Sequence, residues 1–384
     1  MARRNVFSAN VTTRTAVLRT LGGIAIVLAA SSAAQASTLN VCKSGCTYST
    51  IQAAVNAAKT ADVIQIGAGT YFENIVITNK SLSLLGAGED FTVIDGSSRG
   101  AVIISEASGF SASSSFSVVG VTVTHGSAGG IVVGVDTFTL TNSIIASNYG
   151  PGLLLASANV TISGSVITHN ENKAGQGGGI STEADLGLDA QITIVNSSIV
   201  RNTAGMGGGG IFADENQHFS VSGSTISDNT ASVGGGIYVT SEEFPRTAPG
   251  ASLRLDSSTV ENNHATTDGG GICGSAVIFN SVVARNTAGH NGGGISNADS
   301  CIGSFAPPVL QLTTVTVAGN SASNVGGGIS ATNVTADGVV IVQNTAGSKD
   351  GGIVASTLTL VGTTLATQNI PNNCDVPTGG CPNP

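Results

Sequence analysis

A glycine-rich unit that ends in an aliphatic residue recurs along the chain, and it limits the possible folds more than any other feature. Two copies are residues 224–237 (STISDNTASVGGGI) and 286–295 (NTAGHNGGGI). The aliphatic residue falls at Ile131, Leu153, Ile180, Ile211, Ile237, Ile272, Ile295, Ile329 and Ile353. The mean interval is about 28 residues and the shortest is 22, from Ile131 to Leu153. A fixed minimum with longer exceptions indicates stacked solenoid coils, some of which carry surface loops.

The segments between the glycine runs indicate strands. Residues 191–195 (QITIV) and 312–317 (LTTVTV) alternate Ile, Val or Leu with polar residues, as in a strand with one buried face. No helical stripe of adequate length follows residue 60, which disfavours the helix-containing repeats. Glycine makes up 53 of the 384 residues and only 10% are charged, which fits many tight turns. We therefore expect an all-β, single-stranded, right-handed parallel β-helix. Each coil would hold three short strands and three turns and lie about 4.8 Å from the next.

An asparagine stands before each glycine run and forms a column of its own. Asparagine tolerates the left-handed backbone of a tight turn, and stacked amides can hydrogen-bond from coil to coil. Because every coil has this residue, we interpret the column as a structural ladder rather than as a ligand-binding face. Its members are Asn170, Asn202, Asn229, Asn263, Asn286, Asn320 and Asn344. None of the glycine runs is followed by Lys-Ser or Lys-Thr, which argues against a phosphate-binding loop.

The two ends of the chain differ from the repeat. A basic region, an apolar run at residues 21–30 and a small-residue ending at Ala36 predict a secretory signal peptide. Ten apolar residues are too few to cross a membrane, which needs about 20. Residues 49–58 predict one helix that would plug the open end of the solenoid. The expected division is a signal peptide at 1–36, a β-helix domain at 37–370 (cap 42–60, coils about 61–365) and a Cys/Pro-rich tail at 371–384.

Charge and cysteine content limit the cellular compartments in which the protein is expected and the classes of partner that it can bind. Removal of residues 1–36 would leave 10 basic and 23 acidic residues, a net charge of −13, which argues against nucleic acid as a partner. The six cysteines all follow residue 36, and an even number in an exported chain favours disulfides. Fifteen pairings are possible, of which the simplest joins Cys42 to Cys46, Cys273 to Cys301 and Cys374 to Cys381. No spacing resembles a zinc site. We expect a secreted, cell-surface or periplasmic protein without a membrane span after signal cleavage.

Two families share motifs with the chain. Residues 48–55 (YSTIQAAV), 69–73 (GTYFE), 84–88 (LLGAG) and 92–96 (TVIDG) resemble the N-terminal cap and first coils of pectin-lyase-like right-handed parallel β-helix proteins. Residues 120–354 resemble the Gly-Gly-Ile repeats of the chlamydial polymorphic outer-membrane proteins, which are surface adhesins. The catalytic motifs of the pectinesterases and polygalacturonases have no counterpart here, apart from a faint likeness at residues 124–126. The resemblance therefore implies the fold and a surface or glycan-binding role more than an activity.

Acidic residues follow the glycine run in three consecutive coils, and they form the candidate ligand site. They are Glu183 and Asp185, then Asp214 and Glu215, then Glu242 and Glu243. Glu183 and Asp214 each lie three residues after the aligned isoleucine, so stacking would place them about 5 Å apart. Such an oxygen cluster suits Ca²⁺, although no cofactor is required. The same spacing would fit the two carboxylates of a retaining glycosidase, with His218 as a further polar contact. A solvated acidic patch is the alternative.

A second candidate site pairs His290 with Asp268 of the preceding coil, because a carboxylate can orient an imidazole for base catalysis. No nucleophile accompanies the pair in the sequence. Three function classes therefore stay open. The first is an adhesin-like protein that binds a polysaccharide, a cell-surface glycan or a surface protein. The second is a polysaccharide lyase or glycoside hydrolase, and the third is a structural envelope protein. The lack of Trp and the presence of only four Tyr disfavour a site built on many aromatic sugar platforms.

Overall fold

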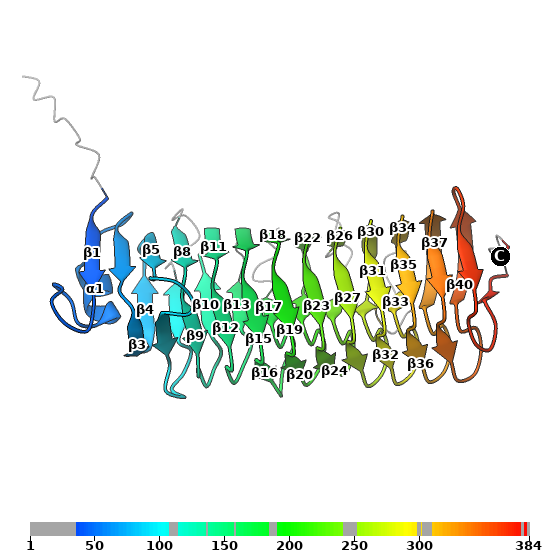
Figure 1. The fold of residues 1–384 in the computed structure, drawn as a ribbon, viewed down its shortest axis with the longest axis horizontal. Coiled ribbons are helices and arrows are strands. Elements are labelled where there is room, and N and C mark those ends of the chain that lie inside the picture. The colour runs from blue at the N-terminus through cyan, green and yellow to red at the C-terminus, as the bar shows by residue number, and fades with distance from the viewer. Residues whose placement is uncertain are drawn as a thin grey trace, which may run out of the picture. The chain divides into compact units, whose positions relative to one another are not determined.

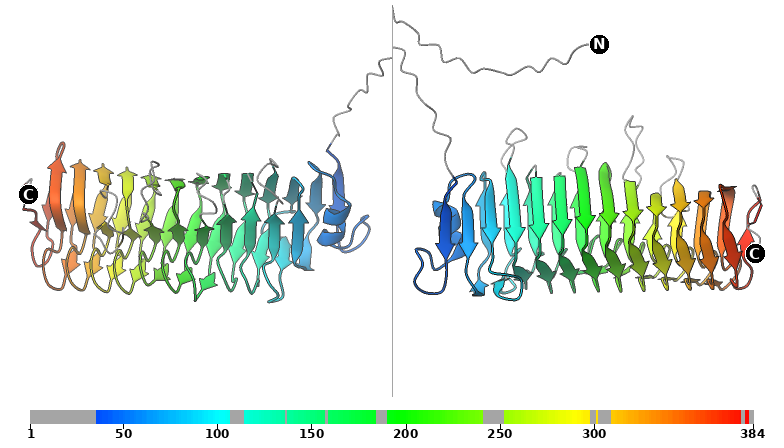
Figure 2. Two further views of the ribbon diagram at one scale, coloured as in Figure 1. Left: turned by 180° about the vertical axis from the view of Figure 1, so that it is seen from behind. Right: turned by 45° about the horizontal axis from the view of Figure 1, so that its top comes forward.

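The computed structural model shows an elongated stack of parallel coils (Figures 1 and 2). It describes residues 36–106, 114–135, 137–156, 159–183, 190–240, 252–297, 301, 309–377 and 380–381. The predicted signal peptide lies outside these residues, apart from Ala36. Every pairing between named strands is parallel, and each strand pairs with the equivalent strand of the next coil. The all-β parallel solenoid predicted from the repeat is confirmed.

The N-terminal cap is formed by β1 (Thr38–Val41), α1 (Ile51–Ala57) and β2 (Val63–Ile66). The helix begins where the hydroxyl of Thr50 accepts the backbone N–H of Ala53. Both carboxylate oxygens of Glu73 accept further N–H groups of the first helical turn, at 2.9 Å. Ile51 and Val55 are buried against the first coils. The predicted plug is confirmed.

The coils contribute strands to four rows. The first row follows the glycine turns and comprises β4 (Ile75–Thr78), β7 (Ile103–Glu106), β10 (Ile131–Gly134), β13 (Leu153–Ala156), β17 (Ile180–Glu183), β21 (Ile211–Ala213), β25 (Ile237–Val239), β29 (Ile272–Cys273), β33 (Ile295–Asn297), β37 (Ile329–Asp337), β40 (Ile353–Leu360) and β42 (Cys374–Asp375). The second row extends β1 and β2 with β5 (Leu82–Leu85), β8 (Ser115–Val119), β11 (Thr137–Thr141), β14 (Asn159–Ser163), β18 (Ala190–Val195), β22 (Gln217–Ser222), β26 (Ser252–Asp256), β30 (Ala276–Phe279), β34 (Leu310–Thr313) and the ends of β37 and β40.

The third row runs along the stack, and seven of the coils add a strand of a fourth row. The third row comprises β3 (Gly69–Phe72), β6 (Thr92–Asp95), β9 (Thr122–Thr124), β12 (Ile144–Ala146), β15 (Val166–Thr168), β19 (Ser198–Val200), β23 (Thr225–Ser227), β27 (Thr259–Glu261), β31 (Val282–Ala284), β35 (Thr316–Ala318), β38 (Val340–Val342) and β41 (Leu365–Thr367). The fourth row comprises the two-residue strands β16 (Glu171–Asn172), β20 (Thr203–Ala204), β24 (Thr230–Ala231), β28 (His264–Ala265), β32 (Thr287–Ala288), β36 (Ser321–Ala322) and β39 (Thr345–Ala346). The prediction of three strands per coil missed this fourth row, because two residues are too few to show a periodicity.

The core is a set of stacked side chains that point inward from the rows. In one coil these are Ile237 from the first row, Leu253 and Leu255 from the second, Val260 from the third and Ala265 from the fourth, all almost fully buried. Each stacks on a similar residue of the neighbouring coils, because the register pairs like positions. Burial of these aliphatic columns supplies the main stabilisation of the stack.

Two buried polar ladders run beside this core. The predicted asparagine ladder is present, and Asn148 and Asn369 extend it at its two ends. The sequence did not reveal the second ladder, in which the hydroxyl of each serine accepts the backbone N–H of the serine one coil earlier. Its members are Ser143, Ser165, Ser197, Ser224, Ser258 and Ser281. Both ladders give buried backbone donors at the turns a partner.

The glycine turns are as narrow as the sequence suggests. Gly234 has φ +57°, a left-handed conformation that glycine adopts without strain. A Cβ at Gly236 would lie 2.6 Å from the carbonyl oxygen of Gly271 in the next coil. The third glycine is therefore needed for close stacking, and the first is needed for the turn.

Three disulfides join Cys42 to Cys46, Cys273 to Cys301 and Cys374 to Cys381, so the simplest predicted pairing is confirmed. The first lies beside the cap and the third lies in the C-terminal segment. The Cys273–Cys301 bridge packs against Val233 and Tyr238. Within the described residues, no helix is long and apolar enough to cross a membrane.

Candidate functional site

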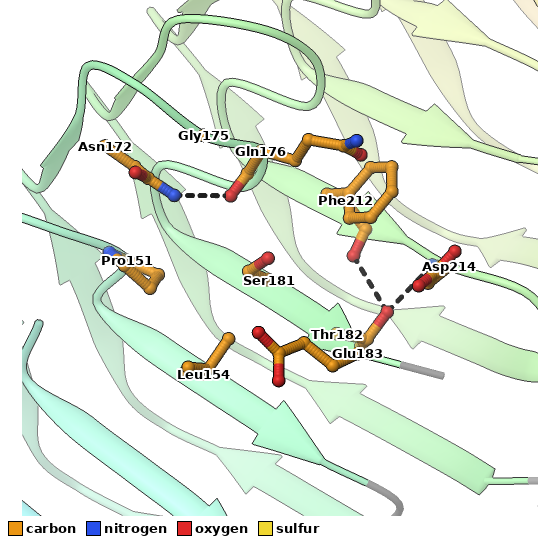
Figure 3. A pocket seen from close by; sticks show the side chains of 10 residues that line it. All are labelled: Pro151, Leu154, Asn172, Gly175, Gln176, Ser181, Thr182, Glu183, Phe212 and Asp214. Atoms are coloured by element: carbon orange, nitrogen blue, oxygen red, sulfur yellow. Dashed lines mark hydrogen bonds between the residues drawn. The ribbon is translucent and has the colours of Figure 1, made fainter. Parts of the chain in front are cut away.

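A groove with a volume of about 390 Å³ lies on the outer face of the first row, where β13, β17 and β21 meet the turn after β16 (Figure 3). Its walls combine apolar and polar groups, as ligand sites usually do, and its size falls within their usual range. The residues that line it are Pro151, Leu154, Asn172, Gly175, Gln176, Ser181, Thr182, Glu183, Phe212 and Asp214.

Alternation along the strands places the side chains of the groove. Ile180 and Thr182 point into the core, so Ser181 and Glu183 of the same strand point outward. Ser181 pairs with Leu154 on one side and with Phe212 on the other. The floor of the groove is therefore a hydroxyl group between two apolar side chains.

The strand register predicted for the acidic residues is correct, since Ile180 pairs with Ile211. The two carboxylates nevertheless point apart: Figure 3 shows the Glu183 carboxylate beside Leu154 and the Asp214 carboxylate on the far side of the Thr182 hydroxyl. Asp214 is held by its backbone N–H, which donates to Thr182 Oγ1 at 2.8 Å. Glu183 is exposed and has no hydrogen bond or ion pair to any residue in the described ranges.

A turn of the fourth row forms the upper wall of the groove. Asn172 Nδ2 donates to the carbonyl oxygen of Gln176 at 2.7 Å, which closes the turn. The turn is joined to the next coil by the N–H of Met206, which donates to the carbonyl oxygen of Gly175. Gln176 extends its amide toward Phe212, and its Oε1 is buried without a described partner. Asn172, Gln176 and Phe212 were not predicted as site residues, because sequence periodicity does not show how a turn folds over a strand.

The structure describes only one of the remaining acidic candidates, Glu215. Asp185, Glu242 and Glu243 lie outside the described residues. Glu215 follows Asp214, and its backbone N–H donates to the Asp214 carboxylate at 3.0 Å. Among the residues that the structure describes, no three His, Cys, Asp or Glu side chains converge on one point. Ca²⁺ binding therefore stays a prediction, and it would need ligands from outside the described ranges.

The second candidate pair is brought together at another position. His290 Nδ1 lies 3.4 Å from Asp268 Oδ1, which also accepts the backbone N–H of Asn291 at 2.9 Å. Asn324 Nδ2 lies 3.4 Å from His290 Nε2 and donates to Asn291 Oδ1. Asp268 is buried and His290 is exposed. Asn291 Nδ2 lies 3.0 Å from His290 Nδ1, so amide groups contact both ring nitrogens, which favours a structural role for this cluster.

The fold and the groove together define a parallel β-helix protein with a groove on its lateral face. The family model described as the right-handed beta helix region matches residues 100–301, and the chain belongs to this family. The pectin-lyase-like right-handed β-helix predicted from the cap and first coils is thereby confirmed. No curated protein matches the sequence.

Several solved structures are similar to this chain. The pectin methylesterase from Aspergillus niger is 16% identical over 74% of this chain and 85% of that chain, with a TM-score of 0.38. The A-module of the mannuronan C-5 epimerase AlgE6 from Azotobacter vinelandii is 15% identical over 86% and 94%, with a TM-score of 0.40. ORF18 of Geobacillus virus E2 is 12% identical over 88% and 62%, also with a TM-score of 0.40.

Proposed function

We propose that the protein binds a neutral polysaccharide in the lateral groove of β13, β17 and β21. The observation that carries the proposal is the carboxylate of Glu183, which is exposed beside the apolar side chain of Leu154 and has no hydrogen bond or ion pair to a residue that the structure describes. A pyranose ring presents hydroxyl groups at its edge and C–H groups on its faces. The carboxylate would accept hydrogen bonds at the edge, the Ser181 hydroxyl would donate or accept one there, and Leu154 would pack against a face.

The charge of the groove selects the class of sugar. Its lining contains two carboxylates, Glu183 and Asp214, and no Lys or Arg. The nearby Lys173 is engaged with Glu171 at 2.9 Å. A uronate in the groove would therefore meet like charge without a compensating cation, whereas a neutral sugar would not. A surface-exposed or secreted adhesin-like protein is the role that we infer from this binding and from the predicted export signal.

The test is retention of the mature protein by soluble polysaccharides in affinity gel electrophoresis. A neutral glucan should retard the wild-type protein more than polygalacturonate does. The double variant Glu183→Gln/Ser181→Ala should weaken retention about tenfold or more, because it removes the charge that strengthens one hydrogen bond and the hydroxyl group that makes another. Glu106→Gln is the matched control, since Glu106 occupies the equivalent outward position three coils earlier, outside the groove.

Two results would contradict the proposal. Retention of the double variant equal to that of the wild type would remove the groove from consideration. Release of reducing ends or unsaturated products by the wild type, lost in Glu183→Gln, would assign the groove to glycoside hydrolysis or lyase chemistry instead of binding alone. Repeating both assays with added Ca²⁺ and with a chelator tests the predicted metal, because only a metal-dependent site would respond.

A further inference from the structure

A ladder of outward hydroxyl groups runs along the second row of strands, away from the residues of the groove. The register pairs each hydroxyl with the next, from one coil to the following one. Its members are Ser83, Ser117, Thr139, Thr161, Thr193 and Ser220. The ladder ends at Arg254, which pairs with Ser220 and places its guanidinium over the ring of Phe279. Six consecutive coils thus present a hydroxyl group at the same position.

The surface beside the ladder carries no formal charge. The outward positions of β5, β8, β11, β14 and β18 include no Lys, Arg, Asp or Glu. Ser115, Thr137 and Asn159 flank the ladder on one side, and Thr141 and Ser163 flank it on the other. Strand residues that face water are commonly charged, and β26, which follows β22 in this row, has both Arg254 and Asp256 at outward positions. Charged side chains at β26 therefore end this uncharged surface on its C-terminal side. Beyond β26, the outward positions of β30 and β34 are again uncharged, and β37 has Asp337.

This surface is hollowed at its N-terminal end. A trough with a volume of about 300 Å³ lies there, and six of its lining residues carry hydroxyl groups: Ser81, Ser83, Ser115, Ser117, Thr137 and Thr139. We call these six residues the hydroxyl trough. Ser117 Oγ donates to Ser83 Oγ at 2.7 Å, and Ser81 Oγ accepts the backbone N–H of Ser115 at 3.0 Å. A hydroxyl group has one donor and two acceptor positions, so each can still bond to a ligand.

The chemistry of the trough selects its occupant. A nucleic acid would need Lys and Arg. A protein partner would need aromatic, Met or Arg anchors, and the six outward side chains of the trough include none. An uncharged polymer with many hydroxyl groups fits the surface. The hydroxyls recur at the coil spacing of about 4.8 Å, which is comparable with the length of one pyranose unit in an extended glycan.

We propose that the hydroxyl trough is a second polysaccharide-binding surface, on which an extended, uncharged glycan lies along the axis of the coils. Each coil would face one sugar unit and exchange hydrogen bonds with it. This surface is independent of the groove, because the two share no lining residue.

The experiment compares isosteric removal of hydroxyls inside and outside the trough. Ser117→Ala/Thr139→Val removes two ladder hydroxyls and keeps a strand-forming residue at position 139. Thr335→Val is the matched control, because Thr335 faces outward in the same row at the C-terminal end of the stack, outside the trough. Each variant is first shown by circular dichroism to melt as the wild type does. Retention by a soluble neutral β-glucan and by polygalacturonate is then measured for all three proteins.

Combined with Glu183→Gln/Ser181→Ala, which removes the contribution of the groove, the trough variant should lower the retention that remains by the neutral glucan about tenfold, and Thr335→Val in the same background should leave it unchanged. A trough variant that is retained as strongly as the wild type would overturn the inference. So would arrest of ice growth by the wild type that the trough variant lacks, without a change in glucan retention, since the array would then bind ordered water. The Glu183→Gln/Ser181→Ala variant leaves the trough intact, so it tests the groove proposal separately.

Discussion

Asn229 donates a hydrogen bond from its side-chain Nδ2 to Oδ1 of Asn263 in the next coil, at 3.0 Å. The same Oδ1 accepts the backbone N–H of Asn229, also at 3.0 Å. A second bond from Nδ2 reaches the carbonyl oxygen of Ile199 in the preceding coil. One buried amide thus satisfies backbone and side-chain groups of three coils, and the next asparagine repeats the pattern.

Replacement of Asn229 by Ala should lower the free energy of unfolding by about 2–3 kcal/mol, because it leaves buried partners in two coils unsatisfied. Chemical denaturation followed by circular dichroism measures the change. Asn159→Ala, at an exposed outward position, is the control and should change stability by no more than about 0.5 kcal/mol. Equal effects of the two substitutions would show that the ladder does not contribute to stability.

Replacement of Ile237 by Asp should prevent stable folding of the surrounding coils. Ile237 is fully buried between Ile211 and Ile272, and a carboxylate there can neither be solvated nor paired. We expect a loss of more than about 4 kcal/mol, seen as a large drop in the thermal midpoint. Val282→Asp, at a position that is 38% exposed, should melt close to the wild type.

Replacement of Gly236 by Ala should cost about 1–3 kcal/mol, since the new Cβ would meet a carbonyl oxygen of the next coil that cannot withdraw. At Gly134 the nearest atom to such a Cβ is 3.8 Å away, so Gly134→Ala should leave the stability unchanged or raise it slightly. Denaturant midpoints of the two variants decide the matter. A stable Gly236→Ala protein would indicate that the glycine turn can open.

Replacement of Asp350 by Asn should stabilise the protein at neutral pH. Burial raises the pKa of the Asp350 carboxyl, the negative charge of Asp375 adds to the rise, and the hydrogen bond from Asn372 opposes it. The folded state therefore holds this proton more tightly than the unfolded state, whose pKa is about 3.9. The contribution of this carboxyl group to stability is fully present at a pH below its pKa in the unfolded state. It is lost as the pH rises through its pKa in the folded state.

The advantage of Asp350→Asn should therefore be present at pH 7 and disappear at a pH below about 3. Thermal midpoints across this range, for the wild type and the variant, provide the test. Asp90→Asn, at an exposed position, is the control. An advantage of equal size at every pH would show that the effect is not caused by ionisation.

The repeat in the sequence predicted most of the fold because each coil has the same interior requirement. Ile237, Asn229 and the glycine turn occupy equivalent positions in successive coils, so their spacing alone indicates stacked parallel strands. The sequence did not predict the two-residue strands of the fourth row or the serine ladder. Serine at a position such as Ser224 is also common at exposed turns, so its burial cannot be read from its identity.

The candidate site could be predicted only in part. The offset of Glu183 from Ile180 gave the correct register with Asp214, because register follows from the repeat. The direction of a carboxylate depends on local bonds, such as that from the backbone N–H of Glu215 to Asp214 Oδ1, which no pattern encodes. Gln176 lines the groove because the turn after β16 folds over the strands, and the sequence does not show the path of this turn. The hydroxyl trough likewise depends on a hollow in the surface, whereas the sequence shows only that Ser and Thr alternate with aliphatic residues.

The connection between the first-row strand and the second-row strand differs in length from coil to coil. In β37 and β40 these rows are one continuous strand, whereas residues 240–251 separate β25 from β26. The pairing of β26 with β22 is nevertheless in register, so extra residues at this corner leave the stack undisturbed. Loop-closure entropy rises only slowly with length. Insertions and deletions at this one corner can therefore change the outer surface of the molecule while the ladders and the aliphatic columns keep their positions.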